Sequence, residues 1–154
     1  MRAVLQRVTH ASVRVDDEVV GRIGTGLLIL LGIAKDDGES ALQYIVNKIQ
    51  TLRIFSDEQG KMNRSLSDAG GAILLVSQFT LLGNTAKGRR PGFDQAAPPD
   101  KAKRLFEEAV TRLRREGMTV ETGRFGAHMQ VELLNDGPVT FILDSNQGIS
   151  PVEA

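Results

Sequence analysis

The order of hydrophobic patterns along the chain is the feature that most constrains its fold. Residues 3–15 alternate apolar and polar side chains, which is typical of a half-buried strand. Residues 27–34 and 72–82 are apolar runs, which are typical of strands buried on both faces. Residues 118–144 return to strand-like patterns, whereas residues 38–52 and 98–117 repeat apolar side chains at helical spacing. The sequence therefore predicts an α+β fold: a single domain with a mixed or antiparallel sheet, or a barrel-like one, and two main helices packed on it.

Composition narrows the class of protein. Nineteen Lys and Arg residues balance nineteen Asp and Glu residues, so a site for a polyanion has to be local. The sequence has no cysteine, which excludes disulfides and thiolate chemistry, and no apolar run approaches the roughly eighteen residues that a membrane helix needs. We expect a cytoplasmic protein with one domain over residues 1–145 and a polar tail over residues 146–154.

Signatures of the common enzyme classes are missing from the sequence. It has no Gly-x-Ser-x-Gly motif, no Walker loop and no His-Glu-x-x-His zinc motif. The stretch GRIGTG, residues 21–26, lacks dinucleotide-binding spacing and leads into a strand, so we interpret it as a hairpin turn. Neither His10 nor His128 has further ligands at a metal-like spacing, and we expect His128 on a solvated strand face. We therefore expect neither a metal nor a cofactor.

A Gly137–Pro138 pair interrupts the last alternating run. Because proline has no backbone N–H, it is confined to the first residue, the edge or a bulge of a strand. One interpretation is a simple turn that enters a strand. The other is a turn with a shape of its own that shows its backbone to a ligand.

Two further segments carry polar groups that packing does not require. Ser77, Gln78 and Thr80 lie in the apolar run VSQFTLL, where buried hydroxyl and amide groups cost free energy unless they are hydrogen-bonded. They either satisfy one another at the end of the strand or face a ligand. The long loop over residues 83–100 carries three cations that either solvate it or grip phosphate groups. These cations are Lys87, Arg89 and Arg90.

Together these segments resemble a known family. SQFTL (residues 77–81) and NDGPVT (residues 135–140), at this spacing, are similar to the two signature motifs of the D-aminoacyl-tRNA deacylases, which hydrolyse D-amino acids from tRNA. The resemblance covers nearly the whole chain, including QRVTHASV, RIFSDEQGKMN, KGRRP and TGRFGAHMQVEL. The chain departs from the family in its longer polar tail and in Gly92, where a serine is usual; the second departure bears on how the basic loop lies on tRNA.

The resemblance implies a homodimer in which the Gly137–Pro138 peptide bond is cis. The turn of one subunit is implied to reach the pocket of Ser77 to Thr80 in the other. There the Gly137 carbonyl rejects the side chain of an L-amino acid and leaves glycine partly accepted. The residues implied to support the turn are Arg7, Phe125 and Met129.

The implied reaction is hydrolysis of the ester that joins an amino acid to the terminal ribose of tRNA. The backbone amides of Phe79 and Thr80 are candidates for an oxyanion hole, and the side chains of Ser77 and Gln78 for orienting substrate or water. Because Thr80 has no evident base beside it, direct attack by water, helped by the ribose 2′-hydroxyl, is favoured over a Thr80 nucleophile. Two alternatives stay open: a non-catalytic tRNA- or nucleotide-binding homodimer, and a hydrolase of small esters.

Overall fold

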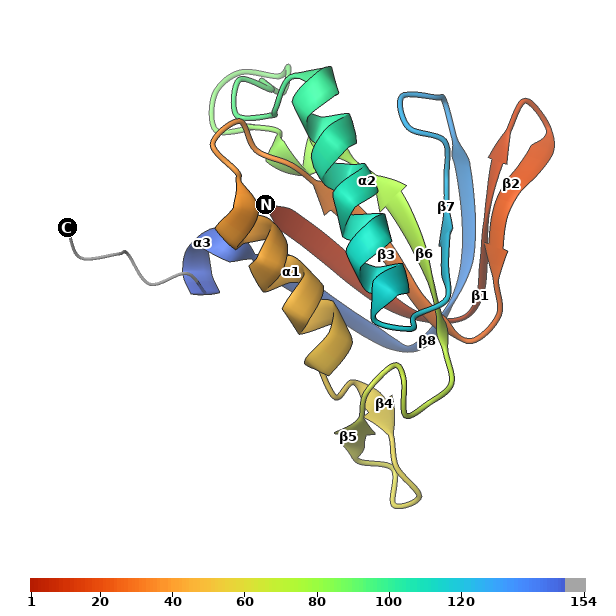
Figure 1. Cartoon of the computed structure of the whole chain (residues 1–154). Coiled ribbons are helices and arrows are strands. Elements are labelled where there is room, and N and C mark those ends of the chain that lie inside the picture. Colours follow the sequence, from red (N-terminus) through yellow and green to blue (C-terminus); the bar gives the residue numbers. More distant parts are fainter. Residues whose placement is uncertain (149–154) are drawn as a thin grey trace.

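The computed structural model describes residues 1–148, whose main sheet is mixed and has two helices along one face (Figure 1). β1 (Arg2–Val15) pairs antiparallel with β2 (Glu18–Ile23) and β3 (Gly26–Gly32) along one edge and with β8 (Gln130–Asp144) along the other. On the far side of β3, β6 (Ala72–Ser77) and then β7 (Val120–Thr122) continue the sheet in parallel. The predicted α+β class is confirmed.

Glycines allow two close backbone approaches in this sheet. A β-carbon on Gly21 of β2 would stand 2.3 Å from the carbonyl oxygen of Thr122 in β7, so the two ends of the strand order β2-β1-β3-β6-β7 come together there. Within the sheet, a β-carbon on Gly26 of β3 would stand 1.9 Å from the carbonyl oxygen of Ala72, its partner in the neighbouring strand β6. Any larger residue would force these backbones apart. The sheet is therefore nearly closed into a barrel, as the sequence predicted as one of its alternatives.

The GRIGTG stretch is a bend within a strand, and the expectation of a hairpin turn there was wrong. Ile23 at the end of β2 and Gly26 at the start of β3 continue one antiparallel register along β1. The hairpin lies one step earlier, between β1 and β2, where Asp16 and Asp17 both have positive φ, at 49° and 65°. Two successive residues of positive φ are typical of a type I′ turn.

The two predicted helices are α1 (Glu39–Thr51) and α2 (Pro99–Arg115), which lie beside each other across the sheet (Figure 1). α2 begins with proline, whose missing N–H costs nothing at that position. The largest fully buried side chains come from α1 and the sheet, and include Leu5, Leu27, Ile29, Leu42, Ile45, Ile49 and Ile73. The side chains that α2 buries against them are Leu105, Phe106, Ala109, Val110 and Leu113. Within residues 1–148, no helix is long and apolar enough to cross a membrane.

Smaller elements complete the fold. β4 (Phe55–Ser56) and β5 (Met62–Arg64) form a separate two-stranded hairpin. The short helix α3 (Ser145–Gly148) lies at the start of the segment expected to be a polar tail, and residues 149–154 of that segment lie outside the described residues. The α-ammonium group of Met1 is buried and donates to the Asp37 carboxylate at 2.5 Å and to the Ser145 hydroxyl at 2.8 Å.

Candidate active site

The candidate site begins where β6 ends. The expected strand over residues 72–82 stops at Ser77, and the chain turns at Gln78 into a single-turn 3-10 helix, η1 (Phe79–Leu82). The last sheet bond is donated by the Gln78 N–H to the Leu31 carbonyl at 2.8 Å. Beyond that point the helix packs over Gly32, where a β-carbon would stand 2.6 Å from the Leu82 side chain and 2.9 Å from the Gln78 carbonyl oxygen. The last apolar residues of the run, Leu81 and Leu82, therefore pack against the end of β3 instead of extending β6.

Side chains around η1 hold it in place. The Gln78 amide donates to the Thr80 hydroxyl, so these two polar groups satisfy each other. The Arg2 guanidinium donates to the Leu81 carbonyl at 2.8 Å and pairs with Asp144 at 3.1 Å. Burial raises the pKa of the Asp144 carboxyl, but hydrogen bonds from the Asn146 N–H and Arg2 outweigh it and hold the pKa below its usual value of 3.8. Arg2 thus ties the C-terminal end of β8 to the end of η1.

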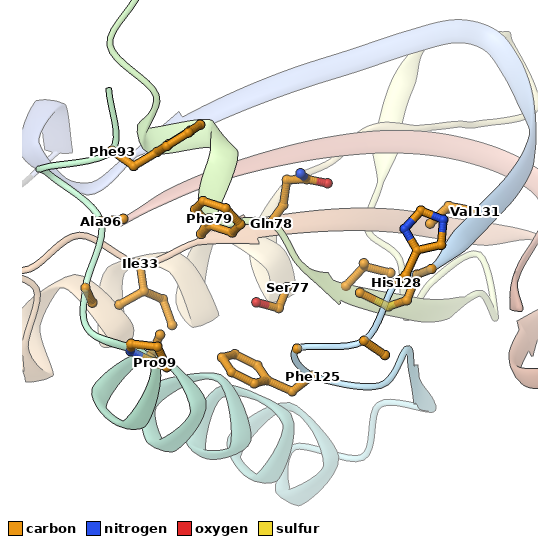
Figure 2. A pocket seen from close by; sticks show the side chains of 16 residues that line it. Ile33, Ser77, Gln78, Phe79, Phe93, Ala96, Pro99, Phe125, His128 and Val131 are labelled. Atoms are coloured by element: carbon orange, nitrogen blue, oxygen red, sulfur yellow. The ribbon is translucent and has the colours of Figure 1, made fainter. Parts of the chain in front are cut away.

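A cavity of about 570 Å³ opens beside β6 and η1 (Figure 2). Its sixteen lining residues include five of those predicted from the sequence: Ser77, Gln78, Phe79, Phe125 and Met129. Thr80 is exposed and is not among the lining residues. The size falls within the range of about 300–1,000 Å³ that small-molecule sites occupy.

The two ends of the pocket differ in character. At one end Phe79 meets Phe93 edge-on, with ring centroids 5.0 Å apart, beside Ile33, Ala96 and Pro99 (Figure 2). Ser77 and Gln78 lie in the middle, and the segment that leads into β8 forms the other end. Phe125 lines the side formed by α2, where its ring lies 6.1 Å from that of Phe106. The pocket thus has an aromatic end and a polar middle.

Among the lining residues that sequence reasoning missed, two have aromatic rings. Phe93 sits in the long loop, where a single aromatic residue gives no periodic signal. His128 was expected on a solvated face; it is exposed, but it also lines the pocket opposite the aromatic end (Figure 2). The available signal was its place between Phe125 and Met129 in the stretch TGRFGAHMQVEL.

The basic loop stands beside the pocket. Asn84 and Gly92 form two backbone hydrogen bonds with each other, of 2.8 and 2.9 Å. These bonds close residues 84–92 into a loop, the basic loop. Phe93 follows directly after this closure and lines the pocket. The basic loop carries three exposed cations that are not among the residues lining the pocket: Lys87, Arg89 and Arg90.

The Gly137–Pro138 pair forms a bulge in β8, one of the places where proline is tolerated. The register of β8 on β1 shifts between Gln6 and Val8, which pair with Thr140 and Asn135, so residues 136–139 stand opposite the single residue Arg7. The peptide bond between Gly137 and Pro138 is cis, and both residues are exposed. Gly137 has a φ of +131°, a conformation that suits glycine. Neither residue lines the pocket of its own chain.

The buried side chain of Arg7 in β1 holds this bulge in place. Its side chain is 10% exposed, and its guanidinium donates to the Asp136 carbonyl at 3.1 Å and to the Ile54 carbonyl at 2.9 Å. It also pairs with the half-exposed Asp136 carboxylate at 3.3 Å. The bulge is therefore fixed to β1 and to the segment before β4.

Around Ser77 and Gln78, the chemistry available in the pocket is that of neutral donors. A hydroxyl and an amide side chain lie beside the first N–H groups of η1, which have no partners within that helix. Within residues 1–148, no three His, Asp or Glu side chains gather closely enough to hold a metal ion. Such a site can orient an ester and stabilise negative charge on its carbonyl oxygen.

Comparisons with known proteins agree with this picture. Residues 4–144 match the sequence profile of the family described as D-Tyr-tRNA(Tyr) deacylase. The chain is 56% identical over 147 residues to the D-aminoacyl-tRNA deacylase of Symbiobacterium thermophilum, covering 96% of this chain and 97% of that one. It is 59% identical over 143 residues to that of Cronobacter sakazakii, covering 93% and 99%.

Solved structures share the fold. The c-Myc DNA unwinding element binding protein is 44% identical, with a TM-score of 0.88 over 94% of this chain and 98% of that one. A probable eukaryotic D-amino acid tRNA deacylase is 23% identical, with a TM-score of 0.73 over 92% and 97%. The resemblance carried by SQFTL and NDGPVT is thus confirmed, and the chain belongs to the D-Tyr-tRNA(Tyr) deacylase family.

Proposed function

We propose that this protein hydrolyses the ester bond of D-aminoacyl-tRNA in the cytoplasm and releases the D-amino acid and tRNA. The observation that carries the proposal is the family match over residues 4–144, with the matched SQFTL motif lying at the pocket. The close relatives are named D-aminoacyl-tRNA deacylases. The pocket is large enough for an aminoacyl-nucleoside but not for an RNA helix, so the rest of the tRNA would lie outside it.

The two ends of the pocket suggest how the substrate lies. The aromatic end, with Phe79 and Phe93, suits the terminal adenine, because bases stack on aromatic side chains. The ester then falls beside Ser77 and Gln78, and the aminoacyl group extends towards Phe125 and Met129, which also line the pocket. The cations of residues 87–90 lie beyond the aromatic end, where they can meet the phosphates of the preceding nucleotides.

Water is the attacking group in this mechanism. The Thr80 hydroxyl accepts a hydrogen bond from the Gln78 amide, and an amide N–H₂ cannot take up a proton from it. Thr80 therefore lacks the base that a threonine nucleophile needs. The backbone N–H groups of Phe79 and Thr80 would stabilise the oxyanion, and the ribose 2′-hydroxyl would assist the water. Rapid-quench trapping of an acyl group on Thr80 would overturn this assignment.

Selection against L-amino acids is assigned to the Gly137–Pro138 bulge of a partner subunit. The bulge is exposed, held by Arg7 and absent from the pocket of its own chain. Its β8 neighbours Leu134 and Ile142 are 53% and 70% exposed, an apolar flank that a second copy of the chain would cover. A backbone carbonyl facing the α-carbon rejects an L side chain, while glycine, having none, would be partly cleaved.

The first test compares D-tyrosyl-tRNA with L-tyrosyl-tRNA, each against its spontaneous rate of deacylation. Rapid loss of the D form with the L form untouched supports both the reaction and the chiral selection. Binding of tRNA without turnover of either favours the alternative of a binding module. Equal hydrolysis of both refutes the role given to Gly137 and Pro138.

A second test asks which subunit supplies the bulge. Ser77→Ala damages the pocket and Gly137→Ala damages the bulge, and a heterodimer of the two variants can be isolated through two different C-terminal tags. In the heterodimer only one pocket keeps Ser77, and it belongs to the subunit with the damaged bulge. If the bulge acts on the partner's pocket, that pocket meets an intact bulge, so D-tyrosyl-tRNA is hydrolysed at about half the wild-type rate and L-tyrosyl-tRNA is left untouched. If each bulge serves its own pocket, the same pocket meets the damaged bulge and hydrolyses L-tyrosyl-tRNA as well. Homodimers of each variant are the matched controls.

The role of the basic loop in binding tRNA is tested separately by replacing Lys87, Arg89 and Arg90 with alanine. For single-stranded RNA, the slope of log K against log salt should become shallower by about 0.7 for each phosphate that the variant no longer neutralises. Hydrolysis of a D-aminoacyl-adenosine, which has no phosphates, should not change. An unchanged slope for tRNA would remove the basic loop from the interface.

A further inference from the structure

The turn η1 carries the backbone N–H groups to which the proposed mechanism assigns the oxyanion, yet it is a single turn of helix. At its two ends, the Leu81 N–H donates to the Gln78 carbonyl at 3.2 Å and the Gly83 N–H donates to the Thr80 carbonyl at 3.0 Å. A turn this short fixes several backbone angles with few hydrogen bonds and gains little stability of its own. Contacts from outside the turn therefore decide how firmly it is held.

Arg2 supplies such a contact from the start of β1. Its backbone pairs with Gly32 of β3, over which η1 packs, and with Asp144 of β8. Residues directly opposite each other in a sheet place their side chains on the same face. The Arg2 side chain therefore lies on the same face of the sheet as η1.

The guanidinium of Arg2 is aimed by one carboxylate. Its Nε and Nη2 groups donate to the same oxygen of Asp144, at 3.3 and 3.1 Å, while Nη1 donates to the Leu81 carbonyl at 2.8 Å. Because a guanidinium is planar and rigid, fixing two of its nitrogens also fixes the third. Hydrogen bonds from charged donors are about twice as strong as those between neutral groups. Arg2 thus holds the C-terminal end of η1 in a defined orientation.

We propose that Arg2 is a positioning residue for hydrolysis of the ester and acts through the Leu81 carbonyl. The inference rests on the proposed function, which places the oxyanion at the backbone N–H groups of Phe79 and Thr80. In a helical turn the N–H groups point towards the N-terminal end and the carbonyl groups towards the C-terminal end. A hydrogen bond that anchors the last carbonyl groups therefore also sets the direction of the first N–H groups. Arg2 itself does not line the pocket.

The expected effect is smaller than the loss of an oxyanion donor, which typically slows a reaction about a hundredfold to a thousandfold. Arg2→Met leaves both donors in place, and the packing over Gly32 and the hydrogen bond from Gln78 to Leu31 remain. We therefore expect it to lower the rate constant at saturation about tenfold. The half-saturating concentration should stay within about twofold, because the donors act on charge that develops in the transition state.

The experiment measures single turnovers of D-tyrosyl-tRNA with the enzyme in excess, over a range of enzyme concentrations. Arg2→Lys keeps the charge and one donor for Leu81, and Asp144→Asn keeps the guanidinium but weakens its aim. We expect both rate constants to fall between those of Arg2→Met and the wild type. Arg112→Met is the matched control: Arg112 also links two elements, through Glu39 at 2.6 Å, and does not line the pocket. Its rate constant should equal that of the wild type, and circular dichroism checks that each variant is folded.

The outcomes separate this inference from the function on which it rests. A wild-type rate constant in Arg2→Met overturns the inference, and so does an equal loss in Arg112→Met, because the loss of any bridging ion pair would then suffice. A change confined to the half-saturating concentration also overturns it, since Arg2 would then act as a cation that binds RNA. If Arg2→Met does not fold, wild-type rate constants in both Arg2→Lys and Asp144→Asn overturn it. Failure of the wild-type protein to release D-tyrosine refutes the proposed function, and the inference with it.

Discussion

Replacing Arg7 with methionine removes the guanidinium and keeps a side chain of similar length. The buried Ile54 carbonyl then loses its donor, which costs about 1–3 kcal/mol. The Asp136 carbonyl, at the edge of the exposed bulge, loses a hydrogen bond of about 1 kcal/mol. The ion pair to the half-exposed Asp136 carboxylate adds no more than about 1 kcal/mol. We therefore expect Arg7→Met to lower the free energy of unfolding by about 2–5 kcal/mol.

Urea unfolding followed by circular dichroism measures this loss. All variants are compared at one protein concentration, because the stability of the proposed dimer would depend on it. For a chain of this length, the loss corresponds to a fall in Tm of about 4–20 °C. Asp136→Asn is the matched control, because it removes the carboxylate charge and keeps both carbonyl acceptors. We expect it to cost less than about 1 kcal/mol, and Arg7→Lys to fall between the two.

The same variants also test the link from stability to selection. Once the guanidinium is gone, the bulge loses its attachment to β1 and to the Ile54 carbonyl, so the ratio of D- to L-tyrosyl-tRNA hydrolysis should fall in Arg7→Met and hold in Asp136→Asn. The reasoning is refuted if Arg7→Met unfolds within about 0.5 kcal/mol of the wild type, or if Asp136→Asn costs as much as Arg7→Met.

Three further predictions follow from close contacts described above. Gly26→Ala places a β-carbon 1.9 Å from the Ala72 carbonyl oxygen, so we expect loss of soluble, native protein, checked by near-ultraviolet circular dichroism. Asp37→Asn leaves the buried Met1 ammonium without its carboxylate and should cost about 3–5 kcal/mol in urea unfolding. Because the pKa of Asp144 is lowered, its carboxylate stabilises the fold above its ordinary pKa of 3.8 and loses that effect as the pH falls through the lower folded value. Asp144→Asn should therefore be less stable than the wild type at about pH 7 and should match it at about pH 2, by urea unfolding at both.

Hydrophobic periodicity was enough to predict the elements that build the core. The alternation over residues 3–15 became β1, and the helical spacing of Leu42, Ile45 and Ile49 became α1. It failed where tertiary packing decides the backbone. Leu81 and Leu82 read as strand, but their side chains pack over Gly32 from a 3-10 helix. The glycine-rich stretch GRIGTG is likewise compatible with a bend or with a hairpin turn. Only the pairing of both β2 and β3 with β1 shows that it is a bend.

The candidate site was predictable to the extent that its residues are unusual for their local pattern. Polar groups in an apolar run pointed to Ser77 and Gln78, and a proline in an alternating run pointed to the Gly137 bulge. Phe93 and His128 are ordinary residues for a loop and for an exposed face. They reach the pocket only because the hydrogen bonds at Gly92 and the pairing at the start of β8 bring distant segments together. The local sequence pattern does not predict these long-range contacts.

The place of the bulge in β8 has a consequence for how the molecule moves. β8 pairs with β1 on both sides of the bulge, from Gln130 to Asp144, and Arg7 holds the bulge itself. The backbone amides on either side of the bulge can exchange their hydrogens only when the hydrogen bonds between β8 and β1 open. The amides that flank Gly137 in the ladder should therefore exchange as slowly as those of the buried strands, in contrast to those of the basic loop. A partner would meet a rigid projection, and docking it would require little ordering of the chain.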